Sequence, residues 1–306
     1  MEILTAKPTQ TQYNKIPCTK ELPKFERSVS LLCWVYNEEE LIEEYMHRAN
    51  ALLESCIEDY EIVVVDDCST DRTPELLIQL QNQYPCIRMF RNEKNLNVGL
   101  SCRKAISLAE KDYIFWQTID WAYDISNLRS FLELLKKFDI VAGVRRNPVE
   151  SVSVSANWKP VLALLRLIRI KHLTRRSDTI PKAIISVINY LLIRLLFQVP
   201  LSDYQNVVFY PRKWIQLLEY EAKSSFVNPE ALIKAYWNEM SIVEVPISFI
   251  ARQKGDAKGT RIKAIVSSVT DILSCWNKWV IHKNVLRTRN GVIQRLRPDE
   301  WEQKLL

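Results

Sequence analysis

Three acids follow an apolar run within residues 61–73, and this stretch is the part of the chain best suited to chemistry. Residues 62–65 are apolar and β-branched, as in a buried strand, and Asp66, Asp67 and Asp71 come after them among small polar residues. In an open α/β sheet, ligands bind beyond the carboxyl ends of the strands, where acids can hold a ribose, a base or a metal ion. Because two adjacent like charges repel and need a compensating partner, Asp66 and Asp67 favour a functional role.

The polar residues at 69–71 have an equally good explanation in local structure. Ser, Thr and Asp are preferred at helix starts, and Pro74 is typical of a first helical turn. The sequence leaves open whether these side chains cap a helix over 74–83 or join a site at the strand end.

Three further predicted strands also end in polar residues. These are Tyr36, Asn37 and Glu38 at the end of 29–36, Asn97 and Gly99 in the turn after 87–91, and Thr118 and Asp120 after 113–117. Carboxyl ends of neighbouring parallel strands meet at one edge of a sheet, so we expect all four sets on a common rim. The helix that follows the turn at 95–100 would also present free backbone N–H groups to an anion.

Composition limits the classes of protein to consider. The chain has 306 residues, of which 47% are apolar, which is enough for a packed core and excludes disorder throughout. Seven cysteines without a Cys-x-x-Cys pair indicate reduced thiols in a cytoplasmic protein. The three histidines are scattered, which argues against a histidine metal site or a Ser-His-Asp triad.

The order of predicted elements divides the chain into segments. Residues 1–27 form a polar leader that lacks the apolar core of a secretory signal. Residues 28–150 alternate strands with helices, expected at 39–53, 74–83, 103–109 and 128–137, and this alternation is typical of a parallel sheet. A basic helical segment at 151–200 precedes strands at 202–210 and 242–250 and a long helix at 260–281.

The basic segment has the character of a membrane-surface helix. Between 157 and 200, eight Lys and Arg residues are interspersed with Leu, Ile and Val, and Asp178 is the only acid. Residues 183–199 are the most apolar, but they are short for crossing about 30 Å of hydrocarbon, so we expect them to lie on the membrane. A helix packed on the protein's own sheet is the alternative, and the apolar stripe of 260–281 allows both interpretations.

Taken together, these motifs resemble those of family-2 glycosyltransferases with the GT-A fold. The resemblance rests on Tyr36-Asn37-Glu38, Val65-Asp66-Asp67-x-Ser69-x-Asp71, Asn97-x-Gly99 and Asp120 after a strand. Within that family the chain is most similar to the dolichyl-phosphate mannose synthase and polyprenyl-phosphate branch, through 203–209, 245–247 and 252–259. The resemblance implies an α/β fold with a mostly parallel central sheet, flanking helices and amphipathic helices at a membrane interface.

The resemblance also assigns roles to residues of the first half. Tyr36, Asn37, Glu38, Asp66 and Asp67 would line a nucleoside pocket, with Asn97 and Gly99 forming its neighbouring wall. The family's Asp-x-Asp metal motif aligns with Thr118-Ile119-Asp120, so only the second aspartate is kept. Asp120 would bind Mg²⁺ or Mn²⁺ with the donor diphosphate, and Thr118 would contact the ribose or a metal-bound water. The alternative for Asp120 is a helix cap.

In the second half, the resemblance points to acceptor and phosphate binding over 201–259. Asp203 matches a position near the acceptor, where it would act as a general base or an orienting group. The alternative is a carboxylate in a turn that compensates the positive charge of the basic helix before it. Arg252 and Lys258 belong to a basic loop that would close over phosphates, unless it is simply a solvated charge run.

The implied activity is an inverting transfer of a sugar from a nucleotide-diphosphate donor to a polyprenyl phosphate, by a peripheral or monotopic enzyme at the cytoplasmic face of the membrane. One alternative is a peripheral or soluble glycosyltransferase that elongates a polysaccharide or glycan. Another, from a different class, is a catalytically silent protein that binds nucleotide or membrane, suggested by Thr118 in place of an acid. Nucleic-acid binding is disfavoured, because the basic residues alternate with aliphatic rather than aromatic ones.

Overall fold

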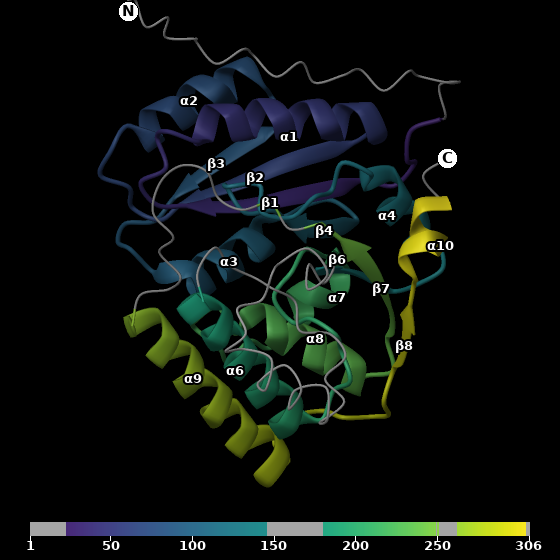
Figure 1. Cartoon of the computed structure of the whole chain (residues 1–306). Coiled ribbons are helices and arrows are strands. Elements are labelled where there is room, and N and C mark those ends of the chain that lie inside the picture. Colours follow the sequence, from purple (N-terminus) through teal and green to yellow (C-terminus); the bar gives the residue numbers. More distant parts are fainter. Residues whose placement is uncertain (1–22, 146–179, 249, 251–261, 304–306) are drawn as a thin grey trace, which may run out of the picture.

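The computed structural model describes residues 23–145, 180–248, 250 and 262–303. These residues form one eight-stranded sheet in the order β3-β2-β1-β4-β6-β5-β7-β8, with helices on both faces (Figure 1). The expected α/β class with a mostly parallel central sheet is confirmed.

The first four strands are parallel and in register. β1 (Val29–Val35) lies between β2 (Tyr60–Asp66) and β4 (Tyr113–Trp116), and β3 (Ile87–Arg91) borders β2. The prediction that these strands end at a common rim is therefore confirmed. The central segments of β1 and β2 are buried and mostly apolar because helices cover both faces of the sheet.

The remaining strands complete the sheet with one reversal. β5 (Ile140–Arg145) is parallel to β7 (Ser241–Ile247), and β7 is parallel to the edge strand β8 (Val292–Arg295). β6 (Val208–Pro211) is antiparallel to both β4 and β5. Since β6 runs opposite to both of its neighbours, β5 points the same way as β4. The carboxyl end of β5 therefore lies at the same rim.

Helices form a layer on each side of the sheet (Figure 1). One layer holds α1 (Ile42–Cys56), α2 (Thr73–Gln83), α4 (Leu128–Leu134) and the C-terminal α10 (Pro298–Gln303). The other holds α3 (Asn97–Leu108), α6 (Ile180–Phe197), α7 (Arg212–Leu217), α8 (Val227–Trp237) and α9 (Ile262–Trp276). No helix in these described ranges combines the length and apolar character needed to cross a bilayer.

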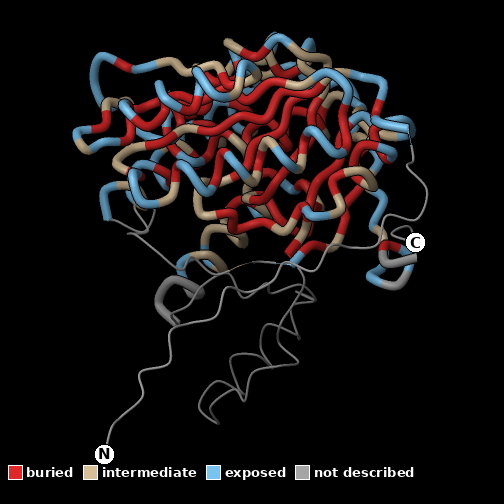
Figure 2. The backbone as a smooth tube through the Cα atoms, turned by 90° about the horizontal axis from the view of Figure 1, so that it is seen from above, coloured by how far each residue is buried: buried red, intermediate tan, exposed pale blue. Residues whose placement is uncertain are grey.

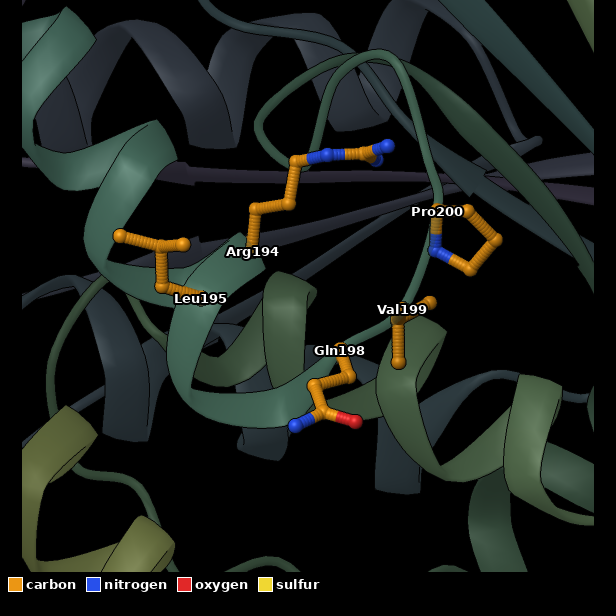
Figure 3. A pocket seen from close by; sticks show the side chains of 5 residues that line it. All are labelled: Arg194, Leu195, Gln198, Val199 and Pro200. Carbon is orange, nitrogen blue, oxygen red and sulfur yellow. The ribbon is translucent and has the colours of Figure 1, made fainter. Parts of the chain in front are cut away.

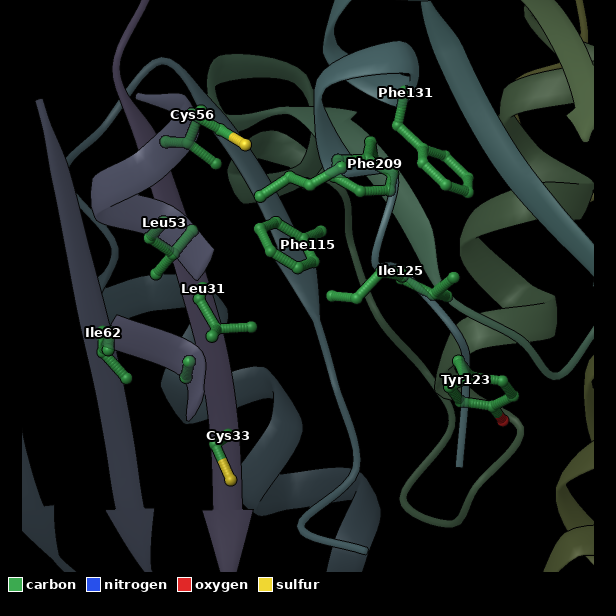
Figure 4. Packing of buried hydrophobic residues seen from close by; sticks show 14 of the residues in the cluster. Leu31, Cys33, Leu53, Cys56, Ile62, Phe115, Tyr123, Ile125, Phe131 and Phe209 are labelled. Atoms are coloured by element: carbon green, nitrogen blue, oxygen red, sulfur yellow. The ribbon is translucent and has the colours of Figure 1, made fainter. Parts of the chain in front are cut away.

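The core lies along the sheet, as the buried central strands in Figure 2 show. On the α1 side, Phe209 of β6 stacks on Phe115 at 4.5 Å and on Phe131 at 5.2 Å between ring centroids (Figure 4). These contacts join β4, β6 and α4, so the reversed strand is fixed by aromatic packing as well as by its hydrogen bonds.

Several boundaries differ from those expected. The strand predicted at 202–210 is shorter, since residues 201–207 form an irregular segment before β6. The helix predicted at 260–281 is α9 followed by a π-helical turn, η4 (Asn277–Ile281). The end of the expected leader already belongs to the fold, because Phe25 is 3% exposed and donates its N–H to Cys56. Residues 1–22 and 151–179 of the segments predicted above lie outside the described residues.

A buried carboxylate joins the strands at the opposite end of the sheet. Glu61 of β2, 3% exposed, accepts hydrogen bonds from Ser30 Oγ at 2.6 Å and the Glu110 N–H at 2.7 Å, and pairs with Arg88 Nη1 at 2.5 Å. Burial alone would raise the pKa of Glu61, but these hydrogen bonds and the guanidinium together lower it below its usual 4.5.

This lowered pKa predicts a pH-dependent cost for Glu61→Gln. A carboxyl whose folded-state pKa is depressed contributes stability above its unfolded pKa and loses it as the pH falls through the folded value. We expect Glu61→Gln to lower the free energy of unfolding by about 2 kcal/mol at pH 7, with the difference shrinking below about pH 4. Urea unfolding of both proteins between pH 3 and 7 measures it, and a difference that does not change with pH would contradict this assignment.

Candidate functional site

The rim formed by the carboxyl ends of β1, β2 and β4 collects the polar residues that the sequence singled out. Val35 lies opposite Asp66 in the register, and the Asp67 N–H donates to the Val35 carbonyl at 2.8 Å. On the other side of β1, the Gln117 N–H donates to the Leu32 carbonyl at 3.3 Å, so the segment that carries Asp120 leaves β4 beside β1. Neighbouring strands are about 4.8 Å apart, and the three loops therefore start close together.

The loop after β1 is bound to the loop after β2. Asn37 has a positive φ of 52°, its Oδ1 accepts the Thr70 N–H at 2.8 Å, and its own N–H donates to Ser69 Oγ at 2.9 Å. The Glu38 N–H donates to Thr73 Oγ1 at 2.9 Å, and Glu38 is 8% exposed. The two loops thus form one wall of the rim.

Residues 69–71, which the sequence left open, serve this local structure. Asp71 accepts the Thr73 N–H at 3.0 Å, at the start of α2, and the Glu39 N–H at 3.2 Å. Burial would raise the pKa of Asp71, but these hydrogen bonds lower it. Asp71 therefore joins the loop after β1 to the segment that leads into α2, and Ser69 and Thr70 act as partners of Asn37.

Asp66 obtains its compensating charge from within the protein. Its side chain is fully buried, Oδ1 accepts the Ser69 N–H at 3.1 Å, and Oδ2 lies 3.2 Å from Arg91 Nε as an ion pair. Arg91 is at the end of β3, about half exposed, and also donates to the Ser69 carbonyl at 2.8 Å. Asp66 and Arg91 together bring both signs of charge to the rim.

Asp67 is bonded to the start of α3. Its Oδ1 accepts the Leu96 N–H at 2.7 Å and Asn92 Nδ2 at 2.8 Å, and its Oδ2 accepts the Asn97 N–H at 2.9 Å. Asn97 is in the left-handed region with φ of 66°. The carboxylate of Asp67 thus determines the shape of the turn that leads into α3, and that turn carries the exposed Asn97 to the rim.

Gly99 permits a close approach between two backbones. A Cβ at this position would lie 2.3 Å from the carbonyl carbon and oxygen of Lys223. The N–H groups of Lys223 and Ser224 both donate to Asp271 Oδ2 of α9, at 2.8 Å each. A side chain at position 99 would separate α3 from this 223–224 segment, which explains the glycine through packing.

The loop that carries Thr118 and Asp120 is closed by its own side chains. Thr118 Oγ1 accepts the Ala122 N–H at 3.1 Å, and the Thr118 carbonyl accepts the Trp121 N–H at 2.9 Å. Gln117 spans the loop, donating from Nε2 to the Tyr123 carbonyl at 2.6 Å and accepting the Thr118 N–H at 3.0 Å. The hydroxyl that replaces the expected acid therefore holds a turn.

The carboxylates of Glu38 and Asp120 lie near the same buried thiol. Burial is the main reason that the pKa of Cys33, on β1, is raised to about 12, and the negative charges of Glu38 and Asp120 add to it. The loops that carry these two carboxylates follow β1 and β4, which are neighbours in the sheet.

Asp203 lies on the same side and is paired with a residue that the sequence analysis missed. Arg145, the last residue of β5, donates from Nε to Asp203 Oδ2 at 2.5 Å and from Nη2 to Oδ1. Both side chains are at most 4% exposed, and Arg145 Nη1 is buried with no hydrogen-bond partner among the described residues. Burial lowers the pKa of Arg145, but the Asp203 carboxylate outweighs it and raises the pKa. The signal in the sequence that could have identified Arg145 was its place as a polar residue at the end of a strand.

The loops that carry Asp120 and Asp203 are in direct contact. The Tyr123 hydroxyl donates to the Gln205 carbonyl at 3.0 Å. Beyond β7, the Ile250 N–H donates to the Ala122 carbonyl at 2.9 Å. Arg252 and Lys258, predicted to bind phosphate, lie outside the described residues, but the chain reaches them from a point bonded to the Asp120 loop.

Within the described ranges, no three His, Cys, Asp or Glu side chains come together in a group that could hold a metal ion. A cation bound here by Asp120 would need its other ligands from a substrate or from water, as Mg²⁺ commonly does. A shallow cavity of about 320 Å³ lies elsewhere, where α6 ends, lined by Arg194, Leu195, Gln198, Val199 and Pro200 (Figure 3).

Comparison with known proteins identifies the family. The sequence model of Glycosyl transferase family 2 matches residues 30–195, more than half of the chain, and the chain belongs to this family. The structure is similar to that of glucosyl-3-phosphoglycerate synthase from Mycobacterium tuberculosis in complex with Mn²⁺, UDP-glucose and phosphoglyceric acid. The TM-score is 0.52 at 13% identity, and the match covers 82% of this chain and 80% of that one. The fold is thus the GT-A fold of this family.

Three curated relatives show the range of similar proteins. Glycosyltransferase AglD of Haloferax volcanii is 23% identical over 85% of this chain, and a dolichol-phosphate mannosyltransferase of Pyrococcus furiosus is 31% identical over 38%. An undecaprenyl-phosphate 4-deoxy-4-formamido-L-arabinose transferase of Pseudomonas fluorescens is 23% identical over 81%. The matches span 38%, 33% and 64% of these relatives' own lengths.

The buried pair of Arg145 and Asp203 predicts strongly unequal effects of single and double substitutions. Arg145→Met leaves the Asp203 carboxylate buried without its partner, and we expect a loss of about 3 kcal/mol in the free energy of unfolding. Adding Asp203→Asn removes that stranded charge and should recover at least about 1 kcal/mol. Denaturant unfolding of the two single variants and the double variant tests this, and strictly additive losses would show that the two side chains are not coupled.

Proposed function

We propose that the protein is an inverting glycosyltransferase that moves a sugar from a nucleotide-diphosphate donor to a polyprenyl phosphate at a membrane surface. The observation that carries this proposal is the convergence, at one rim, of the loops with Glu38, Asp66 and Asp120 and of the paired Arg145 and Asp203. Two relatives have dolichol phosphate or undecaprenyl phosphate in their names, which supports the acceptor class.

The donor nucleoside would lie against the wall formed by the loops after β1 and β2. Tyr36, Asn37 and Glu38 form one side of this wall, and Asp66 is the acid at its base. Asp67 would act through the turn that it holds, since its oxygens already accept three N–H groups, and that turn carries Asn97 and Gly99. Carboxylate and amide oxygens at such a wall suit the donor groups of a base and a ribose.

A divalent cation, Mg²⁺ or Mn²⁺, would be held between Asp120 and the donor diphosphate. Such an ion neutralises the charge that grows on a departing diphosphate. The hydroxyl oxygen of Thr118 accepts the Ala122 N–H, so Thr118 would stabilise the loop. Its O–H would remain free to donate a hydrogen bond to the ribose or to a metal-bound water. Arg252 and Lys258 would approach the same phosphates from the chain that follows Ile250.

Asp203 would orient the acceptor more than deprotonate it. Its carboxylate is held by two guanidinium nitrogens of Arg145, which fix its orientation and occupy a lone pair on each oxygen. A lipid phosphate is already anionic and needs positioning. The buried Nη1 of Arg145 supplies a donor for a phosphate oxygen at this place.

Apolar side chains on α6 and α9 would rest on the membrane. The two helices are neighbours and contact each other (Figure 1). The most exposed of their described apolar residues are Ile188 and Leu195 on α6 and Ile262, Val266 and Leu273 on α9, between 46% and 79% exposed. We call these five residues the α6–α9 surface. Amphipathic helices of this kind bind at the boundary between headgroups and acyl chains.

The metal role of Asp120 is tested by Asp120→Asn. The amide keeps the size of the side chain but removes the charge that would attract the cation, so we expect turnover to fall on the order of 100-fold. A panel of nucleotide sugars, first ranked by thermal shift with Mn²⁺, supplies the donor, and release of the nucleoside diphosphate is measured. The matched control is Asp124→Asn in the same loop, because among the described residues the Asp124 carboxylate accepts hydrogen bonds from Ser126 alone. Unchanged turnover in Asp120→Asn would refute the metal assignment.

The membrane role of the α6–α9 surface is tested with anionic vesicles. Val266→Ser combined with Leu273→Ser removes apolar area from α9, and we expect vesicle binding to weaken about tenfold or more. The control is Leu217→Ser on α7, a residue that is 83% exposed but outside this surface. Co-sedimentation measures binding, and equal losses in both proteins would mean that exposure alone, and not this surface, determines attachment.

A glycosyltransferase that elongates a glycan is the second candidate, favoured by the presence of a carboxylate at the acceptor side. The products separate the two activities, because a sugar on a lipid phosphate is acid-labile and extracts into organic solvent. A product that resists mild acid and stays in the aqueous phase would replace the polyprenyl proposal with this one.

A further inference from the structure

The residue after Asp120 has a backbone conformation that a bulky side chain rarely adopts. Trp121 has φ of 52°, in the left-handed region, and its side chain is 5% exposed. This conformation costs roughly 1–2 kcal/mol for a residue with a Cβ, and it persists only where the surroundings fix it. Such outliers occur mostly at functional sites, so the contacts that hold Trp121 need an explanation.

Two residues of α1 hold the indole from two directions. The ring of Tyr45 meets it edge-on, with 5.5 Å between centroids and 65° between planes. The guanidinium carbon of Arg48 lies 4.3 Å from the indole centroid, within the range of a cation–π interaction. Tyr45 also donates its hydroxyl to the Gln117 carbonyl at 3.2 Å, so α1 is bound to both ends of the loop.

The packing of Trp121 is not optimised for hydrogen bonding. Its Nε1–H is buried and has no hydrogen-bond partner among the described residues. An unpaired buried donor is unfavourable, and a phenylalanine or leucine would avoid it. The choice of an indole at position 121 is therefore explained better by the volume that the ring fills and by its contact with Arg48 than by its polar atom. We call this buried ring the wedge of the loop.

We propose that Trp121, clamped by Tyr45 and Arg48, is a positioning residue that fixes the backbone at Asp120 and so presents its carboxylate to a divalent cation. The inference rests on the proposed function, in which Asp120 binds that cation. A metal site with a single protein carboxylate ligand depends on the placement of that one group more than a site with two. Supporting residues around a metal ligand commonly change metal affinity by 10- to 100-fold when they are replaced.

The test compares Trp121→Gly with Trp121→Phe. Glycine adopts the positive φ without strain but removes the wedge, whereas phenylalanine keeps an aromatic wedge. The affinity for Mn²⁺ in the presence of UDP or GDP is measured from the electron paramagnetic resonance signal of free Mn²⁺, which does not require turnover. We expect about a tenfold weaker Mn²⁺ affinity for Trp121→Gly and less than about threefold for Trp121→Phe.

Arg48→Met supplies a variant that leaves the core packing of the indole in place. It removes the charge over the ring and keeps much of the apolar stem, and we expect about a threefold loss of Mn²⁺ affinity. Hydrogen exchange of residues 118–124 is followed in the same proteins without metal, and it should be faster in Trp121→Gly than in the parent chain. Unfolding by urea confirms that each variant is folded under the conditions used.

The outcomes separate the two hypotheses. If the parent protein binds Mn²⁺ with a nucleoside diphosphate and Trp121→Gly binds it equally well, the positioning role is refuted and the proposed function stands. If the parent protein binds no Mn²⁺ with either nucleotide, the proposed function fails and the inference fails with it.

Discussion

The parallel register of β1, β2 and β4 is the constraint on which the rest of the site depends. The strands are neighbours, and each ends where an apolar run gives way to polar residues. Hydrogen bonds between neighbouring strands fix this alignment along their whole length, so three loops far apart in the sequence begin at one rim. A slip of one residue in β2 would turn Asp66 to the other face of the sheet.

The acids at this rim are stabilised in different ways, and this difference separates their roles. Asp67 is satisfied by backbone N–H groups and an amide, so it shapes the turn before α3. Asp66 depends on the partly exposed Arg91, and Asp203 on the buried Arg145. A repelling pair of neighbouring acids therefore does not by itself require a ligand, because the protein supplies a partner for each one.

Much of the fold could be predicted from the sequence, and the failures have physical causes. Strong alternation of apolar strands and amphipathic helices located β1 to β4 within a few residues, since each element buries a recognisable face. The short edge strand β8 carries too few buried residues to show a pattern, and its position depends on pairing with β7. Arg145 was missed because a charged residue at the end of a strand is usually exposed to solvent. Here it is buried, because a loop distant in the sequence brings Asp203 to it.

The closed turn at Thr118 has a consequence for the loop as a whole. A hydroxyl bonded to the Ala122 N–H, together with the side chain of Gln117, closes the backbone of this turn through hydrogen bonds between neutral groups. A carboxylate at the same position would add negative charge beside Asp120 and Glu38, and the three would repel one another until a cation arrived. The backbone of this turn is therefore held by groups that carry no net charge, and salt screens such hydrogen bonds far less than it screens ion pairs.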